Sequence, residues 1–202
     1  YPQVEVVQIQ FNYLDYDDPK VQSLGCYEVC RNHGKPVFVM EPVKGGSLVN
    51  LPPQAQRIFD DLDGGSNASY AIRYAAGFPG IRAVLSGMST LEQLRENTAF
   101  MRSFQPLSTR EQAAVAQVRS ILRGQGLIPC TGCRYCTEVS PMEIPIPDLF
   151  ARLNDKRRTG TADTAPMGGG KPGDCLCCGK CEEICPQQLP VRELLRSVRD
   201  EL

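Results

Sequence analysis

The sequence predicts an α/β fold followed by a small, mainly α-helical, cysteine-rich domain. Two observations lead to this prediction. Short apolar runs alternate with helical segments over residues 1–104, and eight of the 10 cysteines are concentrated from residue 130 onwards. Strands that alternate with helices favour a parallel sheet with right-handed crossovers.

The first β-α-β unit is read from residues 4–40. Residues 4–11, "VEVVQIQF", mix β-branched and polar residues as strands do. A helical segment follows and ends at "NHG", residues 32–34, because glycine commonly terminates a helix. The short apolar run "PVFVM", residues 36–40, then predicts a strand that is buried on both faces.

The pattern continues with helices at about 53–60 and 66–77, a strand at 81–87 and a helix at 89–101. Three strands make a poor sheet alone, whereas an eight-stranded (β/α)8 TIM barrel usually takes about 250 residues. We therefore expect residues 1–104 to form the closing three-eighths of such a barrel.

Residues 105–202 are assigned to a linker helix and the cysteine-rich domain. The linker helix begins at a capping box formed by Ser108 and Glu111, and it ends at Gly124. Further expected elements are helices at about 148–155 and 190–202 and a glycine-rich linker at 159–173.

The cysteine spacing predicts an iron–sulfur site. The run "CLCCGKCEEICP", residues 175–186, contains C-x2-C-x2-C-x3-C followed by proline, which is typical of 4Fe-4S clusters in bacterial ferredoxins. In two-cluster ferredoxins the fourth cysteine of each run ligates the other cluster. The first cluster is therefore expected to take Cys130, Cys133, Cys136 and Cys185.

The second cluster has three expected thiolate ligands, Cys175, Cys178 and Cys181. The position for its fourth ligand, before Pro141, is occupied by Ser140. A hydroxyl is a harder and less acidic ligand than a thiol, so it holds iron poorly. Three alternatives stay open: a cubane with an oxygen ligand, a three-iron 3Fe-4S cluster, or a cubane completed by Cys177.

Zinc is the competing interpretation, because C-x2-C pairs also build zinc sites. Two C-x2-C-x2-C triplets, each followed by a proline, are not the usual arrangement of four zinc ligands, so iron–sulfur is favoured.

The composition gives little reason to expect that the protein binds nucleic acid or a negatively charged membrane. The net charge of -1 argues against nucleic acid or an anionic membrane surface. No stretch approaches the roughly 18 apolar residues that span a bilayer, and the start of the sequence resembles no signal peptide.

We expect a cytoplasmic protein. Because the chain begins at Tyr1 without methionine, we also expect it to be a fragment. The acidic run "DYDD", residues 15–18, is interpreted as a solvated loop.

Taken together, the motifs resemble the C-terminal part of the aldo/keto reductase family, in the branch with a C-terminal 4Fe-4S ferredoxin-type domain. Three segments resemble barrel strands six to eight: "VEVVQIQFNYLD", "GKPVFVMEPVKGGSL" and "AVLSGMSTLEQLREN". Two resemble the cluster domain: "PCTGCRYCTEVSPMEIPIPDLF" and "CLCCGKCEEICPQQLPV".

The resemblance implies a (β/α)8 barrel that moves a hydride between NAD(P) and a carbonyl or alcohol. It implies that Gln8 lies beneath the nicotinamide and that Met40 replaces a tyrosine that often stacks on that ring. The other implied cofactor-binding residues are Pro42, Gly45 and Gly46 in one loop, and Gly87, Met88, Ser89, Gln93 and Asn97 at the adenosine end. Gln93 and Gly87 replace basic residues of some members, so a preference for NADP does not follow.

The leading hypothesis is an iron–sulfur oxidoreductase that couples NAD(P)H-linked carbonyl or alcohol chemistry to one-electron transfer. Its partners would be a small-molecule substrate and an electron-transfer protein. The family's catalytic Asp, Tyr, Lys and His come from earlier strands, and no segment here matches those motifs. No catalytic residue is therefore named, and this chain alone is expected to be inactive in hydride transfer. The alternative is an electron-transfer or structural iron–sulfur module on a barrel scaffold.

Overall fold

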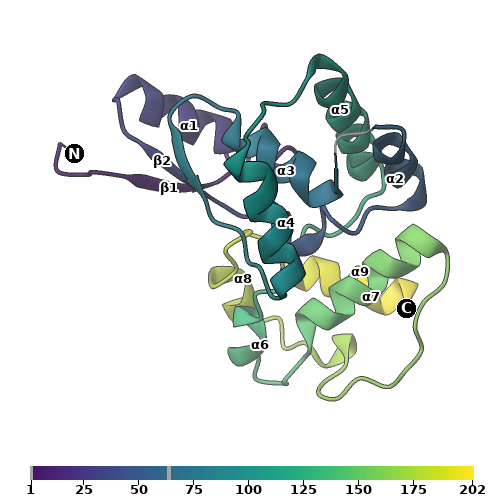
Figure 1. Ribbon diagram of the computed structural model, residues 1–202. Helices are drawn as coiled ribbons and strands as arrows, with labels where there is room; N and C mark the ends of the chain where they lie inside the picture. The colour runs from purple at the N-terminus through teal and green to yellow at the C-terminus, as the bar shows by residue number, and fades with distance from the viewer. Residues whose placement is uncertain (1, 63–64) are drawn as a thin grey trace. The chain divides into compact units, whose positions relative to one another are not determined.

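The computed structural model describes residues 2–62 and 65–202. The chain divides into two compact units, residues 1–124 and 125–202, which Figure 1 shows in purple to teal and in green to yellow. Each unit has its own hydrophobic core, and each is described by itself.

The first unit contains a parallel sheet of three strands in the order β1-β2-β3. The strands are β1 (Val7–Gln10), β2 (Val37–Met40) and β3 (Ile81–Val84). The crossover from β1 to β2 contains α1 (Ser23–Asn32), and the one from β2 to β3 contains η1 (Lys44–Gly46), α2 (Pro53–Asp60) and α3 (Asn67–Ala76). This arrangement confirms the α/β prediction, and three parallel strands with helical crossovers are what part of a TIM barrel would contain.

The central strand explains why the sheet forms at this point in the sequence. Val37 and Val39 of β2 are fully buried and pack with Tyr27 of α1 and Ala75 of α3. β-branched residues that alternate on a strand present one continuous apolar face. At the end of β1, Phe11 extends this core, with its ring 4.8 Å from that of Phe78.

Two later helices of this unit begin at capping boxes, and the one at Ser108 was predicted. Helix α4 (Leu91–Arg102) begins after Thr90, whose hydroxyl accepts from the Gln93 backbone N–H at 3.2 Å. Helix α5 (Thr109–Gly124) begins after Ser108, whose backbone N–H donates to the Glu111 carboxylate at 2.7 Å.

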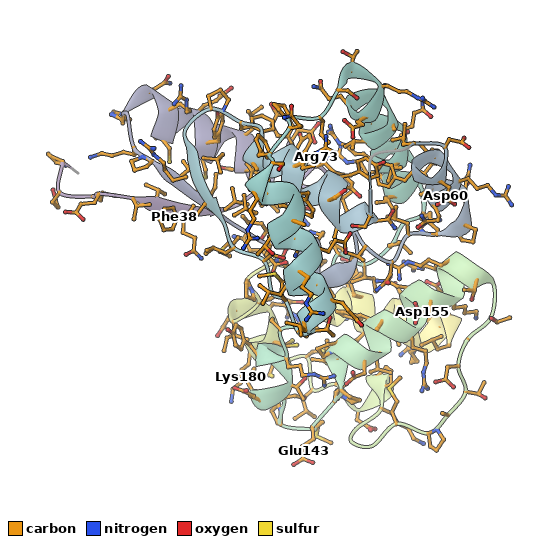
Figure 2. The ribbon with its side chains drawn as sticks, in the orientation of Figure 1. Phe38, Asp60, Arg73, Glu143, Asp155 and Lys180 are labelled. Atoms are coloured by element: carbon orange, nitrogen blue, oxygen red, sulfur yellow. The ribbon has the colours of Figure 1, made fainter. Side chains whose placement is uncertain are left out.

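Helix α5 belongs to the first unit, so the boundary between units lies after Gly124 and not at the expected residue 104. Its buried residues Val115 and Val118 share a core with Phe59 of α2 and Tyr70 of α3. The Arg73 guanidinium, labelled on α3 in Figure 2, also pairs with Glu111 at 2.7 Å. An apolar face that packs this extensively makes α5 part of the core and not a linker.

Every element assigned in residues 125–202 is a helix. They are α6 (Tyr135–Glu138), α7 (Ile146–Thr159), η2 (Pro172–Asp174), α8 (Lys180–Glu183) and α9 (Val191–Glu201). Helix α7 packs against α9 through a core that contains Leu153 and Val198, both fully buried (Figure 1).

The second unit is built from two halves with the same backbone. In each half a cysteine triplet leads into a short helix, then a proline turn and a longer helix. Matched positions share left-handed φ angles: 72° at Gly132 and 55° at Cys177, and 51° at Glu143 and 50° at Gln188. The two halves of the second unit therefore share backbone conformation at matched positions as well as the order of their elements.

The glycine-rich segment expected as a linker makes close backbone contact at its end. The Gly170 backbone N–H donates to the Glu143 carbonyl at 3.2 Å, and Figure 2 labels Glu143 between α6 and α7. A Cβ on Gly170 would lie 2.2 Å from the Met142 carbonyl oxygen. This approach requires glycine, because backbone atoms cannot move aside as a flexible side chain does.

Gly170→Ala is therefore expected to destabilise the second unit by about 1–3 kcal/mol, because the added methyl forces the 142–143 backbone away. The measurement is thermal unfolding followed by cluster absorbance. Gly168→Ala is the matched control, since a Cβ there has no atom within 4 Å. Equal unfolding temperatures for the two variants would contradict the assigned packing.

In the part of the chain that the structure describes, no helix combines the length and apolarity that a bilayer crossing requires.

Candidate functional site

The expected ligands of the first cluster come together in the second unit, although one of them lies in the other cysteine run. Burial, and after it the nearby thiols of Cys130, Cys133 and Cys185, raises the pKa of the Cys136 thiol to about 11. Burial also raises the pKa of Cys130, which interacts with Cys133 and Cys185. Cys185 therefore lies near thiols of the first triplet, and its role as a ligand of the first cluster stays a prediction.

These thiols fit an iron–sulfur cluster in their chemistry as well as their spacing. Thiols whose pKa is raised hold their protons at neutral pH, so iron must displace those protons when it binds. Thiolate is the ligand type that iron–sulfur clusters use. Iron would therefore displace the protons of Cys130 and Cys136 when it binds.

The second group contains Cys175, Cys178 and Cys181, together with Ser140. All four line one small pocket between the 139–146 segment and α9. Burial raises the pKa of the Cys181 thiol, with further contributions from Glu182 and then from Cys175 and Cys178.

Cys177 is not among the residues that line this pocket. Its side chain is exposed, and its Sγ lies 3.8 Å from the Cys175 carbonyl oxygen. The residue has a φ of 55° at the position where the other half of the repeat has Gly132.

Within residues 2–62 and 65–202, no three His, Cys, Asp or Glu side chains converge as ligands of a single metal ion do. Two thiolates on one tetrahedral zinc stand about 3.8 Å apart, given zinc–sulfur bonds of about 2.3 Å. Ligands of an iron–sulfur cluster surround a core of several atoms and stand farther apart.

A separate pocket of about 500 Å³ lies in the first unit, where the segments after β2 and β3 approach each other. Seven of the residues that the resemblance implies for cofactor binding line it: Pro42, Gly45, Gly46, Gly87, Met88, Gln93 and Asn97. Gln8, Met40 and Ser89 are outside its lining. Gln8 and Met40 nevertheless meet on neighbouring strands, where the Gln8 amide nitrogen lies 3.1 Å from the Met40 sulfur.

The loop after β2 is anchored by a buried ion pair. The Lys44 Nζ donates to both oxygens of Asp15, at 2.7 and 2.6 Å, and the two side chains are 2% and 6% exposed. The Asn12 amide and the Gln10 amide donate to the same carboxylate at 2.9 and 2.7 Å. Four donor contacts on one buried carboxylate hold the 41–46 loop against the end of β1.

Asp15 was expected in a solvated loop. That interpretation is wrong, because Asp15 is only 4% exposed. Its partner Lys44 is distant in sequence, so the run "DYDD" gave no sign of the contact. Lys44 was not among the predicted site residues either. The only available signal was its place beside Gly45 and Gly46 in the expected cofactor loop.

The pocket that lies after β2 and β3 is lined by acidic side chains. Among its lining residues, the charged ones are Glu41 and Glu96. The Glu41 Oε2 atom is buried without a hydrogen-bond partner in the described structure. Burial raises the pKa of this carboxyl, while Lys44 and the Gly45 backbone N–H lower it.

Comparison with known proteins gives two matches to family models. The model described as "Aldo/keto reductase family" matches residues 1–120, and the model described as "4Fe-4S dicluster domain" matches residues 129–189. No curated protein matches the chain. The two matched ranges meet near the division between the two units.

Proposed function

The chain belongs to the aldo/keto reductase family and carries a 4Fe-4S dicluster domain, and from this premise we propose its specific function. It is an iron–sulfur oxidoreductase that couples NAD(P)H-linked carbonyl or alcohol chemistry to one-electron transfer through two clusters. The matched segments resemble barrel strands six to eight, which supports the further proposal that this chain is the C-terminal part of the enzyme.

One observation carries the nucleotide half of the proposal. A single pocket gathers residues from the loops after β2 and β3, in the chain that also holds both cysteine groups. Ligands of (β/α)8 barrels bind where such loops follow the carboxyl ends of the strands. Seven residues that the resemblance implies for the cofactor meet there.

The residues of the chain have separable tasks in this proposal. The Lys44–Asp15 pair fixes the 41–46 loop, and the capped N-terminus of α4 presents free backbone N–H groups to a phosphate. The cysteine groups hold the clusters, which accept and donate single electrons when bound. The second unit would then pass electrons to a separate acceptor protein.

The acidic pocket favours NAD(H) over NADP(H). The 2'-phosphate of NADP adds negative charge near the adenosine, and the lining offers Glu41 and Glu96 without a cation. We expect NADH to bind more tightly than NADPH. Glu96→Lys should shift that preference toward NADPH by about tenfold, which corresponds to about 1.4 kcal/mol.

Titration calorimetry with both nucleotides measures this preference. Glu28→Lys is the matched control, because Glu28 is an exposed residue of α1 and lies outside the pocket lining. Anaerobic addition of NADH to a cluster-loaded version of the protein that also carries the catalytic motifs tests the coupling through bleaching of the cluster absorbance. The absence of both binding and bleaching would reject the reductase in favour of an electron-transfer or structural module.

A further inference from the structure

We propose that Ser140 is the fourth protein ligand of the second cluster and that it makes one iron of that cluster removable. The second site then converts reversibly between a four-iron and a three-iron form, while the first site, with four cysteines, does not. This inference rests on the iron–sulfur half of the proposed function and is independent of the nucleotide half.

The internal repeat identifies the role of Ser140. Cys130, Cys133 and Cys136 correspond in order to Cys175, Cys178 and Cys181, and Ser140 corresponds to Cys185. The local hydrogen bonds are the same: the Ser140 N–H donates to the Thr137 carbonyl at 3.3 Å, and the Cys185 N–H donates to the Glu182 carbonyl at 3.3 Å.

The backbone carbonyls of Ser140 and Cys185 also accept corresponding hydrogen bonds. The Ser140 carbonyl accepts from the Glu143 N–H at 3.0 Å, and the Cys185 carbonyl accepts from the Gln188 N–H at 3.0 Å. The backbone therefore presents the serine side chain as it presents the cysteine. Since Cys185 lies with the thiols of the first half, Ser140 is the counterpart that faces the thiols of the second half.

The pocket supports the same assignment and separates it from the alternative ligand. Ser140 lines the pocket together with Cys175, Cys178 and Cys181, and the remaining walls are largely apolar. Cys177 is exposed and lies outside the lining. Of the two candidates for the fourth ligand, only Ser140 lines the pocket that the three cysteines also line.

The hydroxyl has one feature that assists binding to iron. The Ile144 backbone N–H donates to the Ser140 Oγ at 3.2 Å, which stabilises negative charge on that oxygen. The oxygen binds iron as an alkoxide after it loses its proton to water. It remains a harder and more basic ligand than a thiolate, so its bond to iron is the weakest protein bond of the cluster.

The conversion balances with a one-electron oxidant such as ferricyanide. A four-iron core with two ferric and two ferrous ions releases one ferrous ion and gives one electron to ferricyanide, which leaves three ferric ions. The Ser140 oxygen takes up a proton from water when the iron leaves. Dithionite and ferrous ion reverse the step. Because reduction potential depends on cluster type, this loss of iron alters electron transfer through the second unit.

The test uses anaerobically loaded protein, with iron and sulfide analysis and electron paramagnetic resonance. We expect about eight irons per chain before oxidation. Stoichiometric ferricyanide should then release about one iron and produce one three-iron signal per chain, and dithionite with ferrous ion should remove that signal.

Three variants locate the effect. Ser140→Cys should abolish the three-iron signal, and Cys177→Ser should leave it unchanged. Cys185→Ser reproduces the serine ligand at the other cluster, so it should raise the yield to about two three-iron signals per chain. Circular dichroism confirms that each variant is folded.

The outcomes separate this inference from the wider proposal. A protein that loads no cluster overturns both. A protein with about four irons, or one whose three-iron signal persists in Ser140→Cys, overturns the assignment of Ser140 alone. Loss of the second cluster in Cys177→Ser identifies Cys177 as the ligand and also overturns it.

Discussion

Cys185→Ala is expected to remove the first cluster and to leave the second, although Cys185 lies in the second cysteine run. The physical reason is the crossed geometry: the Cys185 thiol contributes to the raised pKa of both Cys130 and Cys136, which places it beside the first triplet. The iron content should fall by about four atoms per chain, because a site with three thiolates and a methyl group retains a cubane poorly.

The comparison that identifies the lost cluster uses one variant from each triplet. The reduced paramagnetic spectrum of Cys185→Ala should match that of Cys133→Ala, which removes a ligand of the first cluster only. It should differ from that of Cys178→Ala, which removes a ligand of the second. A spectrum like that of Cys178→Ala would refute the crossed assignment.

Loss of the first cluster should also lower the stability of the second unit. Its core includes buried residues of α7 and α9, and several of the cysteines belong to it or pack against it. A small domain of this kind gains much of its folding free energy from its metal sites. Iron loss and a lower unfolding temperature of this unit are therefore expected together in Cys185→Ala.

Local chemistry explains what the sequence predicted well. The capping box at Ser108 depends on a residue three positions away, so α5 begins where the pattern placed it. The crossed ligand set was inferred from the pattern of two-cluster ferredoxins, and it stays a prediction.

The features that the sequence did not predict depend on packing between residues that are far apart in the chain. Helix α5 was expected to bridge the units, since its apolar face at Val115 and Val118 gave no indication of which unit would cover it. The same limit applied to Asp15, whose partner Lys44 lies far along the chain. A charged run resembles a solvated loop until the fold brings an opposite charge to it.

Lys44→Met is expected to have the largest effect on the first unit, a loss of about 3–5 kcal/mol in its free energy of unfolding. The substitution keeps most of the side-chain volume and removes the charge, so it leaves the buried Asp15 carboxylate with only amide donors from Asn12 and Gln10. Near-ultraviolet circular dichroism during urea unfolding measures the loss, because Tyr13 and Tyr70 are buried in the core of this unit.

Two further variants show that the cost comes from the unpaired charge. Lys20→Met removes a lysine from an exposed loop and should change the stability of the unit by less than about 0.5 kcal/mol. The double variant Lys44→Met, Asp15→Asn removes both charges and should recover more than half of the loss, because no ionised group is then left buried without a counter-charge. A double variant as unstable as Lys44→Met would assign the cost to packing of the loop and not to charge. Recovery would assign the cost to the uncompensated charge of Asp15, and the proposed binding of NADH should then weaken in Lys44→Met more than in the double variant.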